Sequence, residues 1–116
     1  MSTRALGIKH EDAAVRFLTQ QGLRLHARNY RLRDGEIDLI MYEQSLLVFI
    51  EVKYRKNGNF ASILEQIDNR QLARIRRSAR IFMHQHGIVE HLTPCRFDVV
   101  AITGQPFHIE WLKDAF

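Results

Sequence analysis

Residues 36–55 read EIDLIMYEQSLLVFIEVKYR and contain two β-strand patterns separated by a short polar break. Glu36–Tyr42 indicates one strand, and Glu43–Ser45 indicates a tight turn. Leu46–Ile50 is a continuous apolar run, which is typical of a strand that is covered on both faces. It leads directly into Glu51–Arg55. The pattern predicts a β-hairpin whose second strand lies near the centre of a sheet.

The segments on either side of this hairpin indicate further helices and strands. Before it we expect a helix over Gly7–Gln21 that ends at Gly22, a strand over Leu23–Arg33 and a turn at Asp34-Gly35. After it we expect a loop over Lys56–Asn59, a helix from about Ile63 or Asn69 to His86, a strand over Arg96–Ile102, a turn at Gly104–Pro106 and an edge strand over Phe107–Leu112. This order predicts one α/β domain over residues 1–116, with a mixed sheet flanked by helices.

Composition limits the class of protein. A length of 116 residues fits one domain, and no apolar run approaches the roughly 20 residues that a membrane helix needs. Residues 1–5 lack the apolar core of a signal peptide, and Cys95 is the only cysteine, so we expect a cytoplasmic protein without an intrachain disulfide. The net charge is +4 and the pI is about 9.6, which favours a polyanionic partner, although a solvated basic surface is the alternative.

Charged residues of the hairpin are predicted to lie together at one end of the sheet. Side chains of a strand alternate between its two faces, so Glu51, Lys53 and Arg55 point the same way. Charged groups that close an apolar central strand are costly unless they have a use. The turn before Leu46 could place Asp38 opposite Glu51 or close to it. Two carboxylates and an ammonium group would then be neighbours.

These neighbours suit metal-dependent hydrolysis of a phosphodiester. Two adjacent carboxylates repel, and Mg²⁺ relieves the repulsion while it keeps waters and can bind a phosphate oxygen. We therefore interpret Asp38 and Glu51 as metal ligands, with Mn²⁺ as the expected substitute for Mg²⁺. Lys53 is the candidate catalytic residue that orients the attacking water or stabilises the transition-state charge. The alternative is a salt bridge among the three, since Asp followed by Glu-x-Lys often occurs by chance.

The helix that ends at His86 carries arginines opposite its apolar stripe. Arg70, Arg74 and Arg77 lie opposite the stripe, and Arg76 and Arg80 flank them. Arginine suits phosphate, but a solvated face is the alternative to a DNA contact, because a charge run that faces away from the core does not by itself reach the site. Arg70 and Gln71 begin the helix and are better placed to face the cleft.

Several motifs, in order along the chain, resemble those of the YraN family of bacterial endonuclease-like proteins. The central match is Gly-Glu-Ile-Asp-Leu-Ile at residues 35–40, followed by Val-Phe-Ile-Glu-Val-Lys-Tyr-Arg at residues 48–55. The similarity covers nearly the whole chain: Gly7 and Glu11 match an opening Gly-x-x-x-Glu, residues 29–31 an Asn-x-Arg, residues 96–98 an Arg-Phe-Asp strand, and residues 114–116 an Asn-Ala-Phe ending.

The resemblance implies a restriction-endonuclease-like fold of the PD-(D/E)xK type, similar to Holliday-junction resolvases, with a Mg²⁺ site. Asp38 takes the place of the motif's aspartate, Glu51 of its acidic residue and Lys53 of its lysine. Glu11 is by pattern alone either a third carboxylate or a solvated helix residue. The resemblance gives it the place of the helix glutamate that completes the resolvase site. Gln71 falls near the polar position of the second core helix.

Two hypotheses about function follow. The first is a Mg²⁺-dependent DNA endonuclease or DNA-processing enzyme that holds DNA through Arg31, Arg33, Arg55, Arg70 and Gln71. On branched DNA it would act as a homodimer, because two symmetric cuts need two sites. The alternative is a non-catalytic module, in which a nuclease fold holds nucleic acid or a protein partner. Cleavage assays of variants at the predicted site discriminate between the two.

Overall fold

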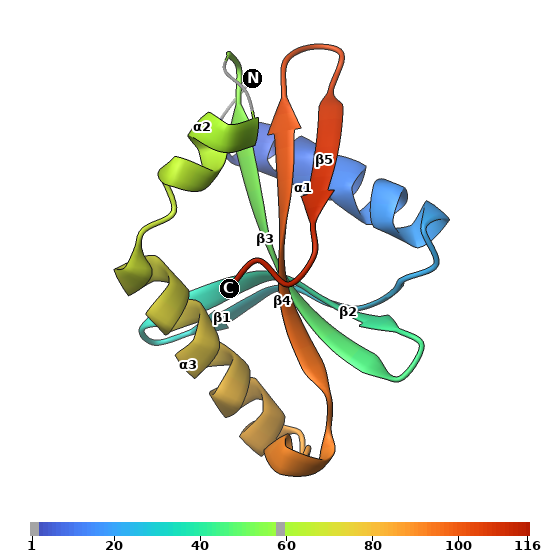
Figure 1. Ribbon diagram of the computed structural model, residues 1–116, viewed down its shortest axis with the longest axis vertical. Coiled ribbons are helices and arrows are strands. Elements are labelled where there is room, and N and C mark those ends of the chain that lie inside the picture. The colour runs from blue at the N-terminus through green and yellow to red at the C-terminus, as the bar shows by residue number, and fades with distance from the viewer. Residues whose placement is uncertain (1–2, 58–59) are drawn as a thin grey trace.

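A mixed sheet forms the centre of the computed structural model, which describes residues 3–57 and 60–116 (Figure 1). The strands in this part of the chain are β1 (Arg24–Leu32), β2 (Gly35–Glu43), β3 (Leu46–Arg55), β4 (Cys95–Thr103) and β5 (His108–Leu112), and they lie in this order across the sheet. Pairing is antiparallel except between β3 and β4, which are parallel. The predicted hairpin, its central second strand and the edge position of the last strand are confirmed.

Helices cover both faces of this sheet. They are α1 (Thr3–Gln20), α2 (Phe60–Glu65), α3 (Asn69–Gln85) and the short 3₁₀-helix η1 (Glu90–Leu92), which no sequence pattern indicates. The one helix predicted after the hairpin is two helices, because the Asp68 side chain accepts a hydrogen bond from the Gln71 N–H at 2.8 Å and caps α3. α2 and α3 form the crossover that the parallel strands require. Of the loop predicted over Lys56–Asn59, residues 58 and 59 lie outside the described residues.

α1 begins at Thr3, earlier than the predicted start at Gly7, and ends as predicted just before Gly22. Gly22 has a φ of +102°, a left-handed conformation that glycine adopts without steric cost. The Leu23 N–H donates to the Leu18 carbonyl at 3.0 Å, which closes the helix end and turns the chain into β1. Among the helices of the described residues, none is long and apolar enough to cross a membrane.

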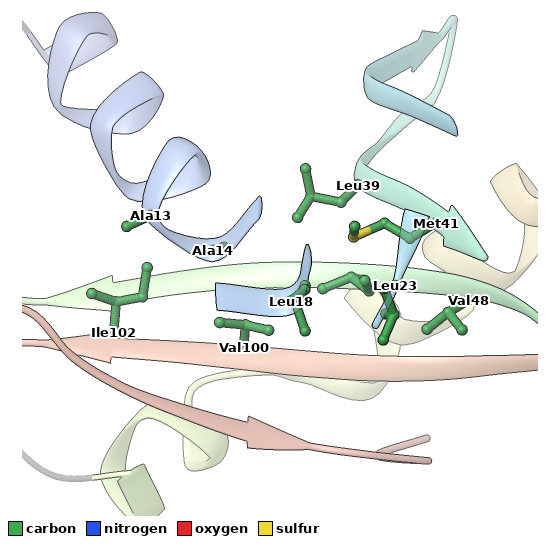
Figure 2. Packing of buried hydrophobic residues seen from close by; sticks show 10 residues of the cluster. Ala13, Ala14, Leu18, Leu23, Leu39, Met41, Val48, Val100 and Ile102 are labelled. Atoms are coloured by element: carbon green, nitrogen blue, oxygen red, sulfur yellow. The ribbon is translucent and has the colours of Figure 1, made fainter. Parts of the chain in front are cut away.

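The two faces of the sheet bury separate apolar clusters. Between α1 and the sheet, Leu18 packs in one cluster with Val48 and Ile50 (Figure 2). On the opposite face, Phe82 of α3 packs edge-on against Phe49, with ring centroids 6.0 Å apart. Successive residues of β3 therefore serve opposite clusters. This confirms the expectation that the apolar run is a strand covered on both faces.

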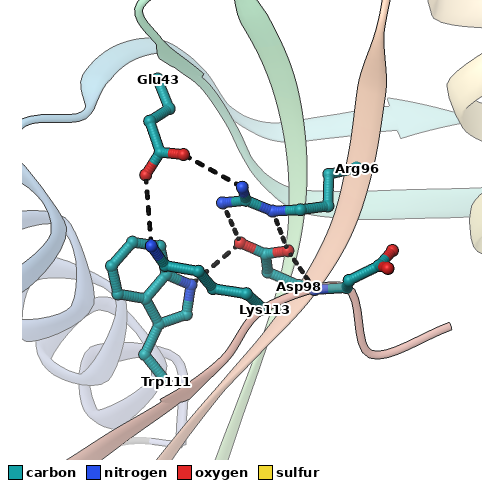
Figure 3. A network of polar contacts seen from close by, with 6 residues as sticks. Glu43, Arg96, Asp98, Trp111 and Lys113 are labelled. Atoms are coloured by element: carbon teal, nitrogen blue, oxygen red, sulfur yellow. Dashed lines mark hydrogen bonds and ion pairs between the residues drawn. The ribbon is translucent and has the colours of Figure 1, made fainter.

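A polar network links β4 to β2, to β5 and to the C-terminal segment (Figure 3). Asp98 is fully buried, and Arg96 donates two hydrogen bonds to its carboxylate at 2.8 and 2.9 Å. The Trp111 indole N–H and the Asp114 backbone N–H also donate to Asp98, each at 2.9 Å. Arg96 donates a third bond to Glu43 at 3.0 Å. The charges of Arg96 and Asp98 are therefore both matched by hydrogen-bonded partners.

Gly35 lies close against α3 near the tip of the β1–β2 hairpin. The turn predicted at Asp34-Gly35 is shifted by one residue, to Arg33-Asp34, because Gly35 already pairs with Leu32. A Cβ at Gly35 would lie 2.6 Å from the Ser78 Oγ of α3. Glycine is needed here for packing of the helix rather than for the turn.

Substitution of Gly35 tests this packing. Gly35→Ala should lower the free energy of unfolding by about 1 kcal/mol, because the added Cβ would meet the hydroxyl of the buried Ser78, which must rotate away. The double variant Gly35→Ala/Ser78→Ala should recover most of that loss. Gly7→Ala is the control, since its Cβ would meet nothing within 4 Å and alanine is the better helix former. Urea unfolding measures all three, and a neutral Gly35→Ala would contradict the close approach.

Candidate active site

The predicted site lies at a fork where β2 and β3 separate. Their pairing ends at Leu39–Ile50, while β2 continues beside β1 and β3 continues beside β4. Asp38 and Glu51 are the next residues on the two strands, and their carboxyl groups lie close enough to affect each other's pKa. The Val52 N–H donates to the Asp38 Oδ2 at 2.8 Å. The proximity of Asp38 and Glu51 expected from the hairpin is therefore found.

The fork holds its two carboxyl groups in an unfavourable electrostatic state. Burial, followed by the nearby charge of Glu51, raises the pKa of Asp38 to about 8. Burial also raises the pKa of Glu51, and the Lys53 ammonium, 3.5 Å from the Glu51 carboxylate, partly opposes that rise. The pair therefore retains a proton at neutral pH. A cation with oxygen affinity would take the place of that proton.

The raised pKa of Asp38 predicts an unusual dependence of stability on pH. Between about pH 4 and pH 8 the unfolded chain loses the Asp38 proton and the folded protein keeps it, so the free energy of unfolding falls as pH rises. Asp38→Asn removes this proton. The variant should gain stability relative to the wild type as pH rises through this window, in chemical denaturation with EDTA present. Parallel curves for the two proteins would show that Asp38 ionises normally.

Glu11 reaches the fork from the α1 side. A cavity of about 200 Å³ is lined by Glu11 and Tyr54 together with both fork carboxylates. Glu11 accepts a hydrogen bond from the Asn29 amide at 2.9 Å and lies 3.5 Å from the Arg28 guanidinium. The negative charge of Glu11 adds to the rise in the Asp38 pKa. The solvated alternative for Glu11 is thus wrong, since its side chain is held in the cavity.

Two residues that hold Glu11 had no assigned role in the sequence. Asn29 has a φ of +50° inside β1, a conformation in which asparagine is enriched. This turn of the backbone accompanies the hydrogen bond from its amide to α1. Arg28 also pairs with Asp12, at 2.7 Å. An asparagine within a strand pattern was the available signal, because asparagine is rare there without a special conformation.

A larger cleft of about 420 Å³ opens on the α3 side of the fork. Its lining comprises Arg31, Leu32, Asp34, Gly35, Glu36, Asp38, Glu51, Gln71, Arg74 and Ile75. Of the residues predicted to bind nucleic acid, Arg31 and Gln71 line this cleft. Arg33, Arg55 and Arg70 do not, and all three are exposed. The fork carboxylates are therefore open to both cavities.

Arg74 contradicts one expectation from the sequence. The arginine face of α3 was expected to point away from the site, yet Arg74 lines the cleft beside Gln71. Gly35 lies against α3 at Arg74 and Ser78, so this part of the helix borders the cleft. Positions 71 and 74 are neighbours on a helix surface, so the spacing from Gln71 was a usable signal.

The charge of the cleft fits a divalent cation. Four carboxyl groups face two guanidinium groups among its lining residues, so the cleft alone repels phosphate. Within the described residues, no group of three or more histidine, cysteine, aspartate or glutamate side chains is placed to hold a metal ion. A cation at the fork would take Asp38 and Glu51 as its side-chain ligands and otherwise water or substrate oxygens. Mg²⁺ is commonly bound in this way.

Comparison with known proteins places the chain in a family. The model described as uncharacterised protein family UPF0102 matches residues 10–102, which include the fork. A UPF0102 protein of Idiomarina loihiensis is 44% identical over 110 residues, or 95% of each chain. One of Xylella fastidiosa strain 9a5c is 39% identical over 116 residues (100% of this chain and 95% of that one), and one of Shewanella amazonensis is 46% identical over 106 residues (91% and 94%). The chain belongs to the UPF0102 family.

Proposed function

We propose that this UPF0102 protein is a divalent-metal-dependent nuclease that hydrolyses phosphodiester bonds of DNA on a PD-(D/E)xK fold. The observation that carries the proposal is the buried Asp38–Glu51 pair, which lies next to the Lys53 ammonium and in which both carboxyl groups have raised pKa values. Such pairs are costly to maintain, and their charge is matched by a bound Mg²⁺ or Mn²⁺. The resemblance to the YraN family supports the same conclusion.

The residues around the fork have different roles in the proposed hydrolysis. Asp38 and Glu51 would hold the cation, which would supply Lewis-acid chemistry by polarising a phosphate oxygen and lowering the pKa of a water molecule. Lys53, half-buried beside Glu51, holds a positive charge where negative charge develops on the phosphate in the transition state. The guanidinium groups of Arg31 and Arg74 bind and orient the phosphate from the cleft walls.

Glu11 supports the site from the opposite side. Its contacts with Asn29 and Arg28 keep its carboxylate in the smaller cavity beside Asp38. There it adds negative charge next to the metal ligands and increases the attraction for a cation. A Glu11→Gln variant should therefore weaken Mg²⁺ binding without loss of the fold.

A binding module without catalysis is the rival function, and the charge of the cleft argues against it. A module that only holds a polyanion would bind more tightly if the carboxylates of the cleft were absent. Four such groups line the cleft of this chain. A bound cation would explain why these carboxylates line the cleft. For a branched substrate we infer a homodimer, acting in the cytoplasm.

The test is cleavage of labelled duplex, single-stranded, flap and four-way-junction DNA by the purified protein. Each substrate is incubated with Mg²⁺, with Mn²⁺ and with EDTA. We expect cutting with either metal and none with EDTA, and the substrate that is cut fastest identifies the preferred structure. Thermal unfolding with and without Mg²⁺ provides a readout besides activity. Absence of both cutting and stabilisation by metal would overturn the proposal in favour of the binding module.

A further inference from the structure

A second groove adjoins the cleft along α3. It has a volume of about 350 Å³, and Arg33, Arg77 and Ile81 are among its lining residues. The residues that line both hollows are Leu32, Asp34 and Gly35. The cleft and this groove therefore meet at the tip of the β1–β2 hairpin.

The arginines of this groove are available to an external anion. Within residues 3–57 and 60–116, the guanidinium groups of Arg33 and Arg77 have no ion-pair or hydrogen-bond partner. Their neighbours differ: Arg31 lies 3.9 Å from the Glu36 carboxylate, and Arg80 lies 3.5 Å from that of Glu90. Asp34 is the one acidic lining residue of the groove. The groove is thus net positive, whereas the cleft is net negative.

The groove and the cleft are lined by neighbouring positions of α3. Arg74 lines the cleft and Arg77 lines the groove, three residues further along α3. Residues three apart on a helix surface have Cβ atoms about 5–6 Å apart, and long arginine side chains extend this reach, so the two guanidinium groups can contact different phosphates of one strand. The exposed Ile81 follows on the same ridge and offers an apolar contact for a sugar. Neighbouring phosphates of one strand fit the two arginines.

We propose that Arg33 and Arg77 form a phosphate-binding site that holds the nucleotide next to the one in the cleft. A nucleic-acid strand then lies along α3, with one phosphate at Arg74 beside the fork and the next in the groove. This inference rests on the proposed function for the nature of the partner. The contact of phosphate with Arg33 and Arg77 requires neither a metal ion nor cleavage, because the groove is positive without a cation, whereas the phosphate at Arg74 requires the cation at the fork.

Salt dependence of duplex DNA binding tests the groove. Binding is measured by fluorescence anisotropy in EDTA at several salt concentrations, and the slope of log K against log salt counts phosphate contacts at ~0.9 each. The double variant Arg33→Gln/Arg77→Gln should lower the slope by about 0.9 or more and weaken binding severalfold. The control is Arg16→Gln, at an exposed arginine of α1 on the other face of the sheet, which should leave the slope unchanged.

The outcomes separate this inference from the nuclease. If the wild type cuts DNA and the double variant has the same slope as the wild type, the groove proposal is wrong and the nuclease proposal stands. If the wild type never cuts DNA and the double variant lowers the slope, the groove proposal is supported and the nuclease proposal is wrong. Equal effects of Arg16→Gln and the double variant per charge removed, or no binding by the wild type, also overturn the groove. Circular dichroism confirms that the variants fold, as expected for exposed positions.

Discussion

Asp38→Asn should reduce Mg²⁺-dependent cleavage of DNA by roughly a thousandfold or more. A metal ligand in a nuclease contributes several kcal/mol of transition-state stabilisation, and each 1.36 kcal/mol is a tenfold change in rate. Asparagine keeps the shape of the protonated carboxyl and the acceptor for the Val52 N–H. It cannot release a proton to make room for a cation. The rate is measured under single-turnover conditions with saturating enzyme.

Binding of DNA in EDTA should be nearly the same for Asp38→Asn and the wild type at pH 7. The pKa of Asp38 is raised to about 8, so at pH 7 and without metal its carboxyl is mostly protonated and has the charge of asparagine. Loss of cleavage with retained binding therefore identifies a chemical role. Asp34→Asn, the same substitution at an exposed carboxylate of the same cleft, is the matched control and should cut within a few-fold of the wild type. If Asp38→Asn cuts like Asp34→Asn, the fork is not the catalytic centre.

The parts of this fold that followed from sequence are those set by local periodicity. β3 was predicted from Leu46 to Arg55 because its apolar run and the alternation after it depend only on the pleat of a strand. The hairpin register then placed Asp38 near Glu51. The sequence left two possible starts for the helix, Ile63 and Asn69, and the Asp68 cap places the start of α3 at Asn69. Helix starts without a recognisable cap, such as that of α1, were misplaced.

The remaining features depend on contacts between segments that are distant in sequence. Arg74 lines the cleft where α3 lies against Gly35 near the hairpin tip, and the periodicity of the helix does not encode that crossing. The hydrogen bond from the Asn29 amide to Glu11 likewise joins two distant segments, β1 and α1. The sequence patterns indicated an arginine face on α3, but the division of that face between the cleft and the groove is a tertiary property.

Asp98→Ala should have the largest effect on stability of any substitution at these sites. Asp98 is fully buried and accepts hydrogen bonds from Arg96, Trp111 and the backbone of Asp114. Its removal leaves these donors without an acceptor and the Arg96 charge with Glu43 alone. A broken buried ion pair costs about 3–5 kcal/mol, a large part of the ~5–15 kcal/mol that stabilises a domain of this size. Urea unfolding should show a much lower midpoint or an unfolded variant.

A comparison with an exposed ion pair separates burial from charge in this prediction. Asp12 pairs with Arg28 at 2.7 Å, but both side chains are partly exposed, so Asp12→Ala should cost about 1 kcal/mol or less. The joint replacement Arg96→Met/Asp98→Leu leaves no unpaired charge and should be less destabilising than the sum of its two single variants. Additive single effects would mean that Arg96 and Asp98 stabilise the protein independently. The observed geometry, in which one carboxylate receives two bonds from one guanidinium, requires strong coupling between them.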